Sequence, residues 1–260
     1  SRPRTCWLRG VRPTSSWPRF KKSADADRLV TRACYRSPRA RLALEGLMDR
    51  DVEVSCRCGN VHGHVTGASP GAVNRVVCYC SDCQAFVHWL RRPDLLDAHA
   101  GSHIVQVAPA ALSFDRGQEH IRCVKLSDKG MYRWYASCCN TPLGNSPRPA
   151  IPFIGLLTQG FVGGPAVVDQ AFGVSRGSFF GEFGVGDVPQ EARRLNVLLL
   201  LRSIWRILSF RFSGKAWPHP YFERETQAPR YPVTVLTSAE RDALRPLCGP
   251  RPSASASAHA

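Results

Sequence analysis

The sequence CYCSDC at residues 78–83 follows CRCG at residues 56–59 and precedes the pair CC at residues 138–139. Cysteines one or two residues apart bridge to each other only with strain, whereas zinc accepts thiolates at this spacing. The clusters therefore predict a zinc protein. Seven of the eleven cysteines belong to them: Cys56, Cys58, Cys78, Cys80, Cys83, Cys138 and Cys139.

The spacing of these cysteines divides them into two kinds of site. Residues 78–83 bring three thiols from one segment, and three protein ligands with an open position are typical of a catalytic zinc. The pair Cys56 and Cys58 supplies only two of the four ligands that a structural zinc needs. We expect the distant pair at residues 138–139 to complete that site. The sequence thus predicts two zinc ions per chain.

A disulfide framework is the rival explanation for so many cysteines, but it belongs to small secreted domains that cannot build a sufficient core. This chain has 260 residues, of which 43% are hydrophobic, and it can bury one substantial core. The cysteine number is odd, and no signal-peptide pattern stands near the start. We expect a reducing, cytoplasmic setting.

The net charge of +15 is concentrated at one end of the chain. Residues 1–47 hold twelve Lys and Arg against three Asp and Glu, and they show no sustained apolar period. They are predicted to be a disordered basic extension that precedes the natural start at Met48. A basic nucleic-acid-binding arm is the alternative, although a nucleic-acid partner is not our expectation.

From Met48 onward the pattern predicts a mainly β protein with a helical C-terminal extension. Short alternating segments are broken by Gly, Pro and Asn, as in small antiparallel sheets. We place a zinc-binding β domain at 48–150, an extension at 151–250 and a frayed tail at 251–260. The predicted strands are Val52–Ser55, Gly63–Thr66, Val73–Cys78, Ile104–Ala108, His120–Leu126 and Tyr132–Ala136.

Three helices are predicted. A short one covers Asp82–Leu90 with Asp82 as its cap, and a capping box of Thr237 and Glu240 starts another at Ser238. The longest runs over 189–212, where four arginines argue against a transmembrane span. We expect it to pack on the sheet or on a second copy of the chain, and an interfacial membrane helix is the alternative.

The three clusters resemble the motifs of the glutathione-dependent formaldehyde-activating enzymes and the related centromere protein V group. Those motifs are Cys-x-Cys-Gly, Cys-x-Cys-x-x-Cys-Gln and Cys-x-x-Cys-Gly-Thr-Pro-Leu, and this chain shows CRCG at 56–59, CYCSDCQ at 78–84 and ASCCNTPLG at 136–144. The resemblance covers residues 52–145. It implies a β-tent of small antiparallel sheets, with a structural zinc at the first and third motifs and a catalytic zinc at the second.

The third motif departs from the family pattern, because the position of its first ligand falls on Ala136. Cys138 is the only nearby replacement, and adjacent cysteines bind one ion only if the peptide between them accepts an awkward geometry. The fourth ligand of the structural site is therefore either Cys138 or another group.

The resemblance implies a carbon-sulfur lyase that acts on a thiol adduct, such as that of glutathione with formaldehyde or another small aldehyde. The catalytic residues are then Cys78, Cys80 and Cys83, and the partner is a small-molecule thiol. The alternative is a non-catalytic zinc-stabilised β module that binds a protein. Histidines 62, 64 and 88 and Asp82 are the candidates for proton transfer. We expect Cys123 to be a buried apolar cysteine, and Trp134, Tyr135, Trp205 and Trp217 to be core residues.

Overall fold

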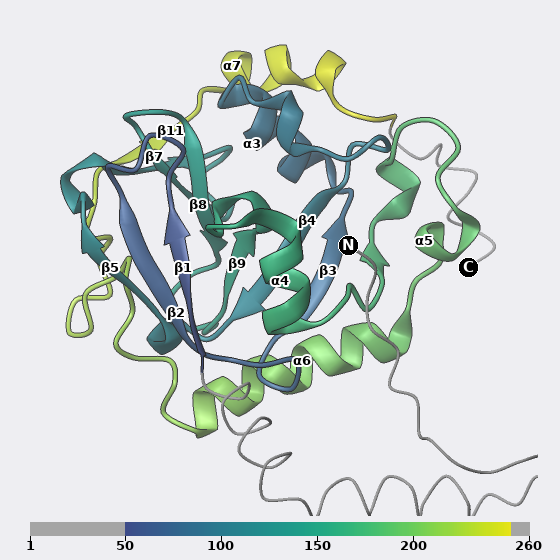
Figure 1. Ribbon diagram of the computed structural model, residues 1–260. Coiled ribbons are helices and arrows are strands. Elements are labelled where there is room, and N and C mark those ends of the chain that lie inside the picture. The colour runs from purple at the N-terminus through teal and green to yellow at the C-terminus, as the bar shows by residue number, and fades with distance from the viewer. Residues whose placement is uncertain (1–49, 251–260) are drawn as a thin grey trace, which may run out of the picture. The chain divides into compact units, whose positions relative to one another are not determined.

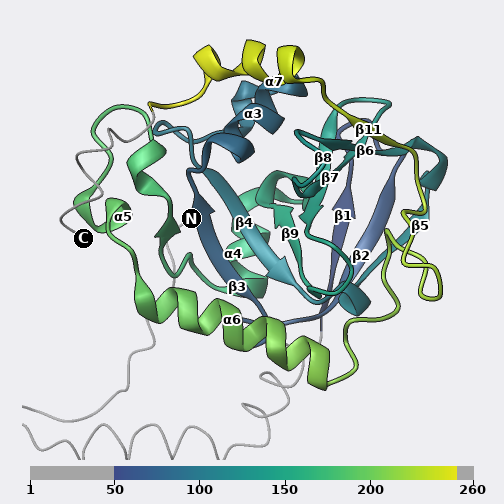
Figure 2. The same ribbon diagram turned by 180° about the vertical axis from the view of Figure 1, so that it is seen from behind.

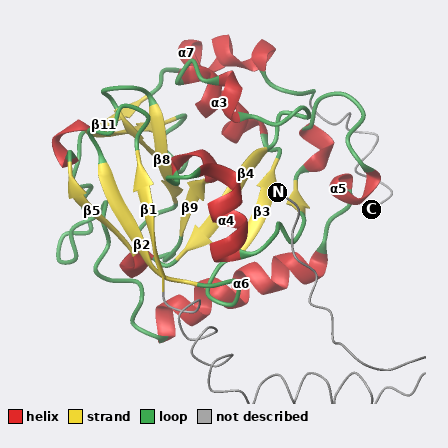
Figure 3. Ribbon diagram, in the orientation of Figure 1, coloured by secondary structure: helices red, strands yellow, loops and turns green. Residues whose placement is uncertain are grey.

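A computed structural model describes residues 50–250 (Figure 1). The predicted basic extension at 1–47 and the tail at 251–260 lie outside the described residues. The described chain forms two β-sheets with helices at their periphery (Figure 3). The prediction of a mainly β protein with a helical C-terminal extension is confirmed.

The smaller sheet has the order β1-β2-β5, and the larger has the order β10-β3-β4-β9-β8-β7-β6-β11. Neighbouring strands are antiparallel, except that β10 joins β3 and β11 joins β6 in parallel at the two edges of the larger sheet. The strands are β1 (Arg50–Ser55), β2 (His62–Ala68), β3 (Asn74–Cys78), β4 (Ser102–Val107), β5 (Leu112–Arg116), β6 (Ile121–Lys125), β7 (Tyr132–Ala136), β8 (Thr141–Ser146), β9 (Ile154–Leu157), β10 (Ser178–Phe179) and β11 (Val233–Val235).

The six predicted strands match β1 to β4, β6 and β7, whereas five further strands escaped prediction. Strand β8 contains Pro142 and Gly144, which ordinarily indicate a turn. The register shifts between Trp134 and Tyr135 where β7 faces this proline, so an irregular pairing accommodates it. Strands β10 and β11 have only two and three residues and depend on a neighbouring strand for their conformation.

The strands after residue 150 share the larger sheet with those before it. Strand β9 pairs with β4 on one side and with β8 on the other. Strands β10 and β11, later still in the sequence, extend the sheet at its two edges. The domain boundary at residue 150 stays a prediction. Strands from both predicted segments, 48–150 and 151–250, belong to the larger sheet.

The helices of the described chain differ from the predicted ones at three points, and the unpredicted helix α4 (Gly164–Phe172) is the first. The segment predicted as one helix over 189–212 consists of two helices, because Asn196 interrupts it and accepts a hydrogen bond from the Leu199 amide at 2.9 Å, as a strong N-cap does. Cys80, and not Asp82, caps the helix before Leu90. The α-helices are α3 (Ser81–Trp89), α4 (Gly164–Phe172), α5 (Gln190–Arg193), α6 (Val197–Phe212) and α7 (Ser238–Leu244), and the 3-10 turns are η1 (Pro93–Leu95), η2 (Pro109–Ala111), η3 (Gln118–His120), η4 (Thr158–Gly160), η5 (Gly181–Phe183) and η6 (Arg245–Leu247).

The predicted capping box is confirmed at α7, where Thr237 and Glu240 exchange their bonds. Among the predicted core aromatics, Trp134 is buried, whereas Trp205 is 71% exposed, so the prediction for Trp205 was wrong. Trp205 lies on the side of α6 that faces away from the sheet. No helix within residues 50–250 has the length and apolar character that crossing a bilayer requires.

The larger sheet carries different partners on its two faces. Trp134 and Cys123 belong to a continuous core that also includes Val54 of the smaller sheet and Phe172 of α4. The neighbouring residue Arg133 lies on the opposite face, because successive side chains of a strand alternate. That face is covered by α3 at one end and by α6 at the other (Figure 2).

Candidate metal centres

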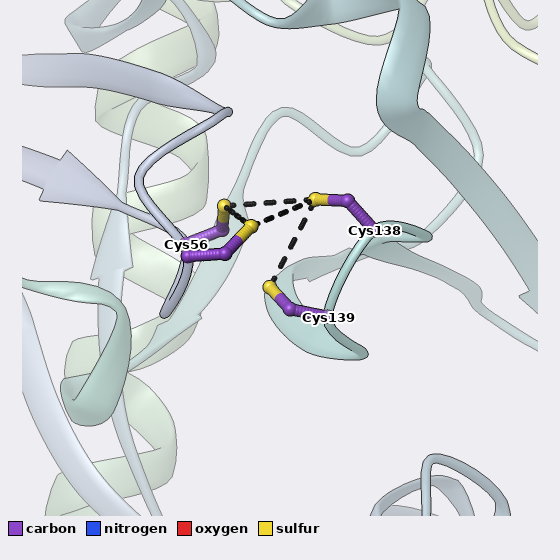
Figure 4. A group of neighbouring side chains, drawn as sticks. Cys56, Cys138 and Cys139 are labelled. Carbon is purple, nitrogen blue, oxygen red and sulfur yellow. Dashed lines mark hydrogen bonds between the residues drawn. The ribbon is translucent and has the colours of Figure 1, made fainter.

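The first candidate centre joins two turns that are 80 residues apart in sequence. Cys56 and Cys58 follow β1, whereas Cys138 and Cys139 lie between β7 and β8. The Sγ atoms of these four residues lie within 4.8 Å of one another. Figure 4 shows the side chains of Cys56, Cys138 and Cys139 pointing toward a common centre. The structure therefore brings together the four cysteines that the sequence assigned to one site.

The distances between the sulfurs fit one tetrahedral ion. Cys56 and Cys58 are 3.5 Å apart, and Cys138 lies 3.8 Å from Cys56, 3.3 Å from Cys58 and 3.9 Å from Cys139. A tetrahedral zinc with bonds of about 2.3 Å to sulfur would place its ligands about 3.8 Å apart. All nine cysteines of residues 50–250 are free of disulfides. The donor set suits a thiolate-binding metal ion such as zinc.

Local backbone conformation explains how both pairs reach the centre. Gly59 has φ +77°, and its amide donates to the Cys56 carbonyl at 2.9 Å, which closes a tight turn. Asn140 has φ +54°, a left-handed conformation that asparagine tolerates better than most residues. The turn directs Cys138 and Cys139 to the same side. Ala136, where the family motif has its earlier ligand, is completely buried and still part of β7.

The hydrogen bonds within the cluster already favour ionisation of one thiol. Burial alone would raise the pKa of Cys139, but hydrogen bonds from the Thr141 hydroxyl and from the Cys58 backbone and thiol lower it to about 6. The Thr141 Oγ1 lies 3.1 Å from the Cys139 Sγ. Burial raises the pKa of Cys56. The Cys139 thiol is therefore ionised near neutral pH and available to bind a metal ion.

The second candidate centre lies at the junction of β3 and α3. Cys78 ends the strand, Cys80 is the N-cap of the helix, and Cys83 lies in its first turn. The Cys78 Sγ is 3.4 Å from that of Cys80 and 3.7 Å from that of Cys83. The helix N-terminus carries a partial positive charge, which favours thiolates at this position. Within residues 50–250 no fourth Cys, His, Asp or Glu joins these three ligand atoms at such distances.

A buried arginine, which sequence reasoning missed, completes the electrostatics of this second centre. The guanidinium of Arg133 is 2% exposed and lies 3.8 Å from the Cys83 Sγ. It also pairs with Asp82 at 3.7 Å and lies over the ring of Phe86 at 5.5 Å. Hydrogen bonds from Cys78 and Cys80, and then the charge of Arg133, hold the pKa of Cys83 well below its usual value.

The alternation of side chains along β7 could have indicated this arginine. Trp134 and Ala136 face the main core, so Arg133 and Tyr135 face the other side of the sheet. The sequence did not show that α3 lies on that side, because Arg133 of β7 and Cys83 of α3 are about fifty residues apart in the chain.

Ser102 is a further polar residue beside the second centre. It is 1% exposed and directly opposite Cys78 in the pairing of β3 with β4, so both side chains lie on one face of the sheet. Its hydroxyl has no hydrogen-bond partner within residues 50–250. A buried hydroxyl without a partner is costly, and polar ligands or water commonly satisfy such groups.

The C-terminal extension wraps the segment that carries the three cysteines. The side chain of Gln84 is fully buried and donates to the carbonyls of Tyr79 at 2.6 Å and Phe183 at 3.0 Å. Its Oε1 accepts a hydrogen bond from the Gly249 amide at 2.6 Å. The glutamine that follows the third cysteine of the motif therefore ties the candidate centre to two distant segments.

Of the candidate proton-transfer residues, some lie near the second centre and others lie on the smaller sheet. His62 and His64 lie on β2 and share the carboxylate of Asp115, at 3.4 and 3.2 Å. They belong to the smaller sheet, whereas the second centre belongs to the larger one. His88 is a half-buried residue of α3. Asp82 is the candidate that the structure links to the cluster, because it shares Arg133 with Cys83.

The fold and the two cysteine clusters define a mainly β protein with two sites suited to metal ions. The chain belongs to the family of unknown function DUF6151, whose family model matches residues 48–229. No curated protein matches it. A crystal structure of a Rhodobacter sphaeroides protein is similar with 17% identity and a TM-score of 0.34, over 45% of this chain and 94% of that one.

Proposed function

We propose that this protein is a zinc-dependent carbon-sulfur lyase that acts on a thiol adduct, such as that of glutathione with a small aldehyde. The observation that carries the proposal is the three-thiol cluster of Cys78, Cys80 and Cys83 with the buried cation of Arg133 against it. Three protein thiols are one ligand short of a closed tetrahedral site, as in catalytic zinc centres. The first cluster has four thiols and serves a structural zinc.

The chemistry requires a thiol to become a nucleophile and to be released again. Addition of a thiol to an aldehyde forms one carbon-sulfur bond, and the thiol proton passes to the carbonyl oxygen; elimination reverses both changes. When bound at the second centre, zinc would supply the positive charge that lowers the pKa of a neighbouring thiol. Arg133 offsets the negative charge of the three protein thiolates, so that an additional anionic sulfur is tolerated. The hydroxyl of Ser102 offers a hydrogen bond nearby.

The resemblance to the glutathione-dependent formaldehyde-activating enzymes supports the same assignment. Residues 56–59 and 78–84 agree with the first two motifs of that family, and Cys139 with the last cysteine of the third. The replacement of its earlier cysteine by Ala136 is compensated by Cys138, which lies 3.3 Å from Cys58. The departure thus affects the structural site and leaves the three-thiol cluster unchanged.

A zinc-stabilised module that binds a protein partner is the second candidate function. It is favoured by the tight enclosure of the second cluster: Cys78 is 9% exposed and Cys83 is 7% exposed. In that case the same thiols would only stabilise the junction of β3 with α3.

The experiment compares Cys80→Ser with Cys58→Ser, its match in the other cluster. We expect the wild-type protein to bind two zinc ions per chain and to accelerate exchange between free glutathione and its formaldehyde adduct, measured by magnetization-transfer NMR. Cys80→Ser should abolish this acceleration and remove one zinc while the thermal transition is retained. Cys58→Ser should instead lower the thermal stability, because it opens the four-thiol site.

Two results would count against the enzyme. A zinc-loaded wild-type protein that does not accelerate the exchange refutes the lyase. Loss of folding in Cys80→Ser, together with loss of its zinc, assigns the second cluster to a structural role.

A further inference from the structure

Helix α6 presents a broad apolar face to solvent. Leu198, Leu201, Trp205, Leu208 and Phe212 recur at intervals of three and four residues, so they share one side of the helix. Leu198 is 78% exposed, Trp205 is 71% exposed and Phe212 is 84% exposed. Val197 and Ile204, also exposed, widen the stripe beyond the two positions per heptad of a coiled-coil seam.

The opposite side of α6 holds it on the larger sheet. Leu199 packs in a cluster with Val76 and Ile104, and the Ser203 hydroxyl accepts a hydrogen bond from the Asn74 side chain at 2.7 Å. Figure 2 shows α6 along the outside of the sheet that contains β3 and β4. The helix is therefore fixed in place with its apolar stripe directed outward, and an exposed patch of this kind marks an interaction surface.

The charged side chains of the segment that contains α6 are all positive. No acidic residue occurs between Glu191 and Glu223. Arg193 and Arg194 are exposed before the helix, and Arg211 and Lys215 are exposed at its other end. The apolar stripe is thus framed by cations at both ends.

We propose that α6 docks this protein on an anionic lipid bilayer surface. A helix that lies in the interface typically buries a Trp-, Phe- and Leu-rich face while its arginines and lysines contact lipid phosphates. With 16 residues, α6 is about 24 Å long, so its two groups of cations can contact lipid headgroups at the same time. The helix rests on the surface and does not cross it.

The charge pattern disfavours two other occupants of the stripe. Two copies of α6 would bring only arginines and lysines to the edges of their interface, where coiled-coil pairs carry opposite charges. The segment 1–47 has twelve basic against three acidic residues, so it too would place positive charge on positive charge. Of the three occupants considered, only an anionic lipid surface has a charge opposite to that of the arginines and lysines at the ends of the stripe.

Vesicle co-sedimentation of the full chain tests the proposal. We expect binding to vesicles of phosphatidylcholine and phosphatidylglycerol at a ratio of about three to one, little binding to pure phosphatidylcholine, and weakening with salt. The apolar variant Leu201→Ser/Trp205→Ser should fall to the level seen with neutral vesicles. The matched control Val174→Ser changes a valine that is 74% exposed outside α6, and it should bind like the wild type.

The charge variant Arg194→Gln/Lys215→Gln should weaken binding roughly 25-fold, since each cation near an anionic surface contributes about a fivefold factor. Circular dichroism before sedimentation checks that each variant is folded. Binding that survives the apolar variant would be assigned to the basic segment 1–47 and would overturn the proposal. A dimer in solution that Leu201→Ser/Trp205→Ser dissociates, without vesicle binding by the wild type, would assign the stripe to a second copy instead.

Discussion

Replacement of Arg133 by methionine is the sharpest test of the electrostatics at the second centre. The guanidinium lies 3.8 Å from the Cys83 Sγ and is almost fully buried. Three thiolates and one zinc ion carry a net charge of −1, and its centre lies about 6 Å from the guanidinium if the zinc–sulfur bond is about 2.3 Å. At an effective dielectric constant of about 20, the attraction is about 3 kcal/mol.

This attraction exists mainly when the thiols are ionised, so it favours the metal-loaded state. Arg133→Met should therefore weaken zinc binding at the second centre by roughly a hundredfold, since about 1.4 kcal/mol corresponds to a factor of ten. The four-thiol centre should keep its affinity. Competition with a chromophoric chelator measures both affinities, and cobalt substitution distinguishes the two centres by their thiolate charge-transfer bands.

Two variants control for the loss of a buried side chain. Arg133→Lys retains the charge and should restore most of the affinity. Arg75→Met removes another buried arginine, which pairs with Asp169 and makes no hydrogen bond to a cysteine within residues 50–250, and it should leave the affinity of the second centre unchanged. A folded Arg133→Met protein that binds both zinc ions as tightly as the wild type would refute this electrostatic reasoning.

Two further predictions concern the enclosure of the site and the aromatic core. Gln84→Leu should destabilise the protein by about 3 kcal/mol, because it leaves one buried and two part-buried backbone groups without their partner, and hydrogen exchange should rise at Phe183 and Gly249; unchanged protection there would contradict this role. Burial, and then the charge of Arg230, lower the pKa of His219 from 6.5 to about 3, so the unfolded chain binds the extra proton between these values and stability falls as the pH falls from 6.5 to about 3. The loss attributable to His219 is up to about 5 kcal/mol, and His219→Asn should flatten the pH dependence of urea unfolding; an identical slope in the variant would exclude this origin.

Much of the mainly β fold was readable because strand alternation is a local property. Val52–Ser55 and Tyr132–Ala136 alternate clearly and are strands, and the capping box at Thr237 identified the start of α7. Strand β8 escaped prediction because Pro142 and Gly144 normally break a strand, and only the neighbouring strands β7 and β9 stabilise it. The break at Asn196 was missed because an apolar period continues across it.

The two candidate centres also differ in how far local sequence predicts them. The grouping of Cys78, Cys80 and Cys83 follows from the sequence alone. The three lie within six residues, so a local turn is enough to bring their sulfurs to one ion. The assignment of Cys56, Cys58, Cys138 and Cys139 to one site was predicted because zinc needs four ligands. The two turns that carry them bring the four sulfurs close enough to bind one ion. Whether Cys138 could replace the residue at Ala136 depended on the backbone at Asn140.

The sequence by itself determined the number and type of sulfur ligands, the short strands and the basic character of α6, since these depend on residue identity and local spacing. Only the tertiary structure decided that Arg133 lies against Cys83, that Gln84 ties the cysteine loop to Gly249, and that the apolar stripe of α6 faces outward. These contacts join residues that are far apart in the chain. Sequence periodicity shows that a side chain faces one side of its element, and only packing shows what lies on that side.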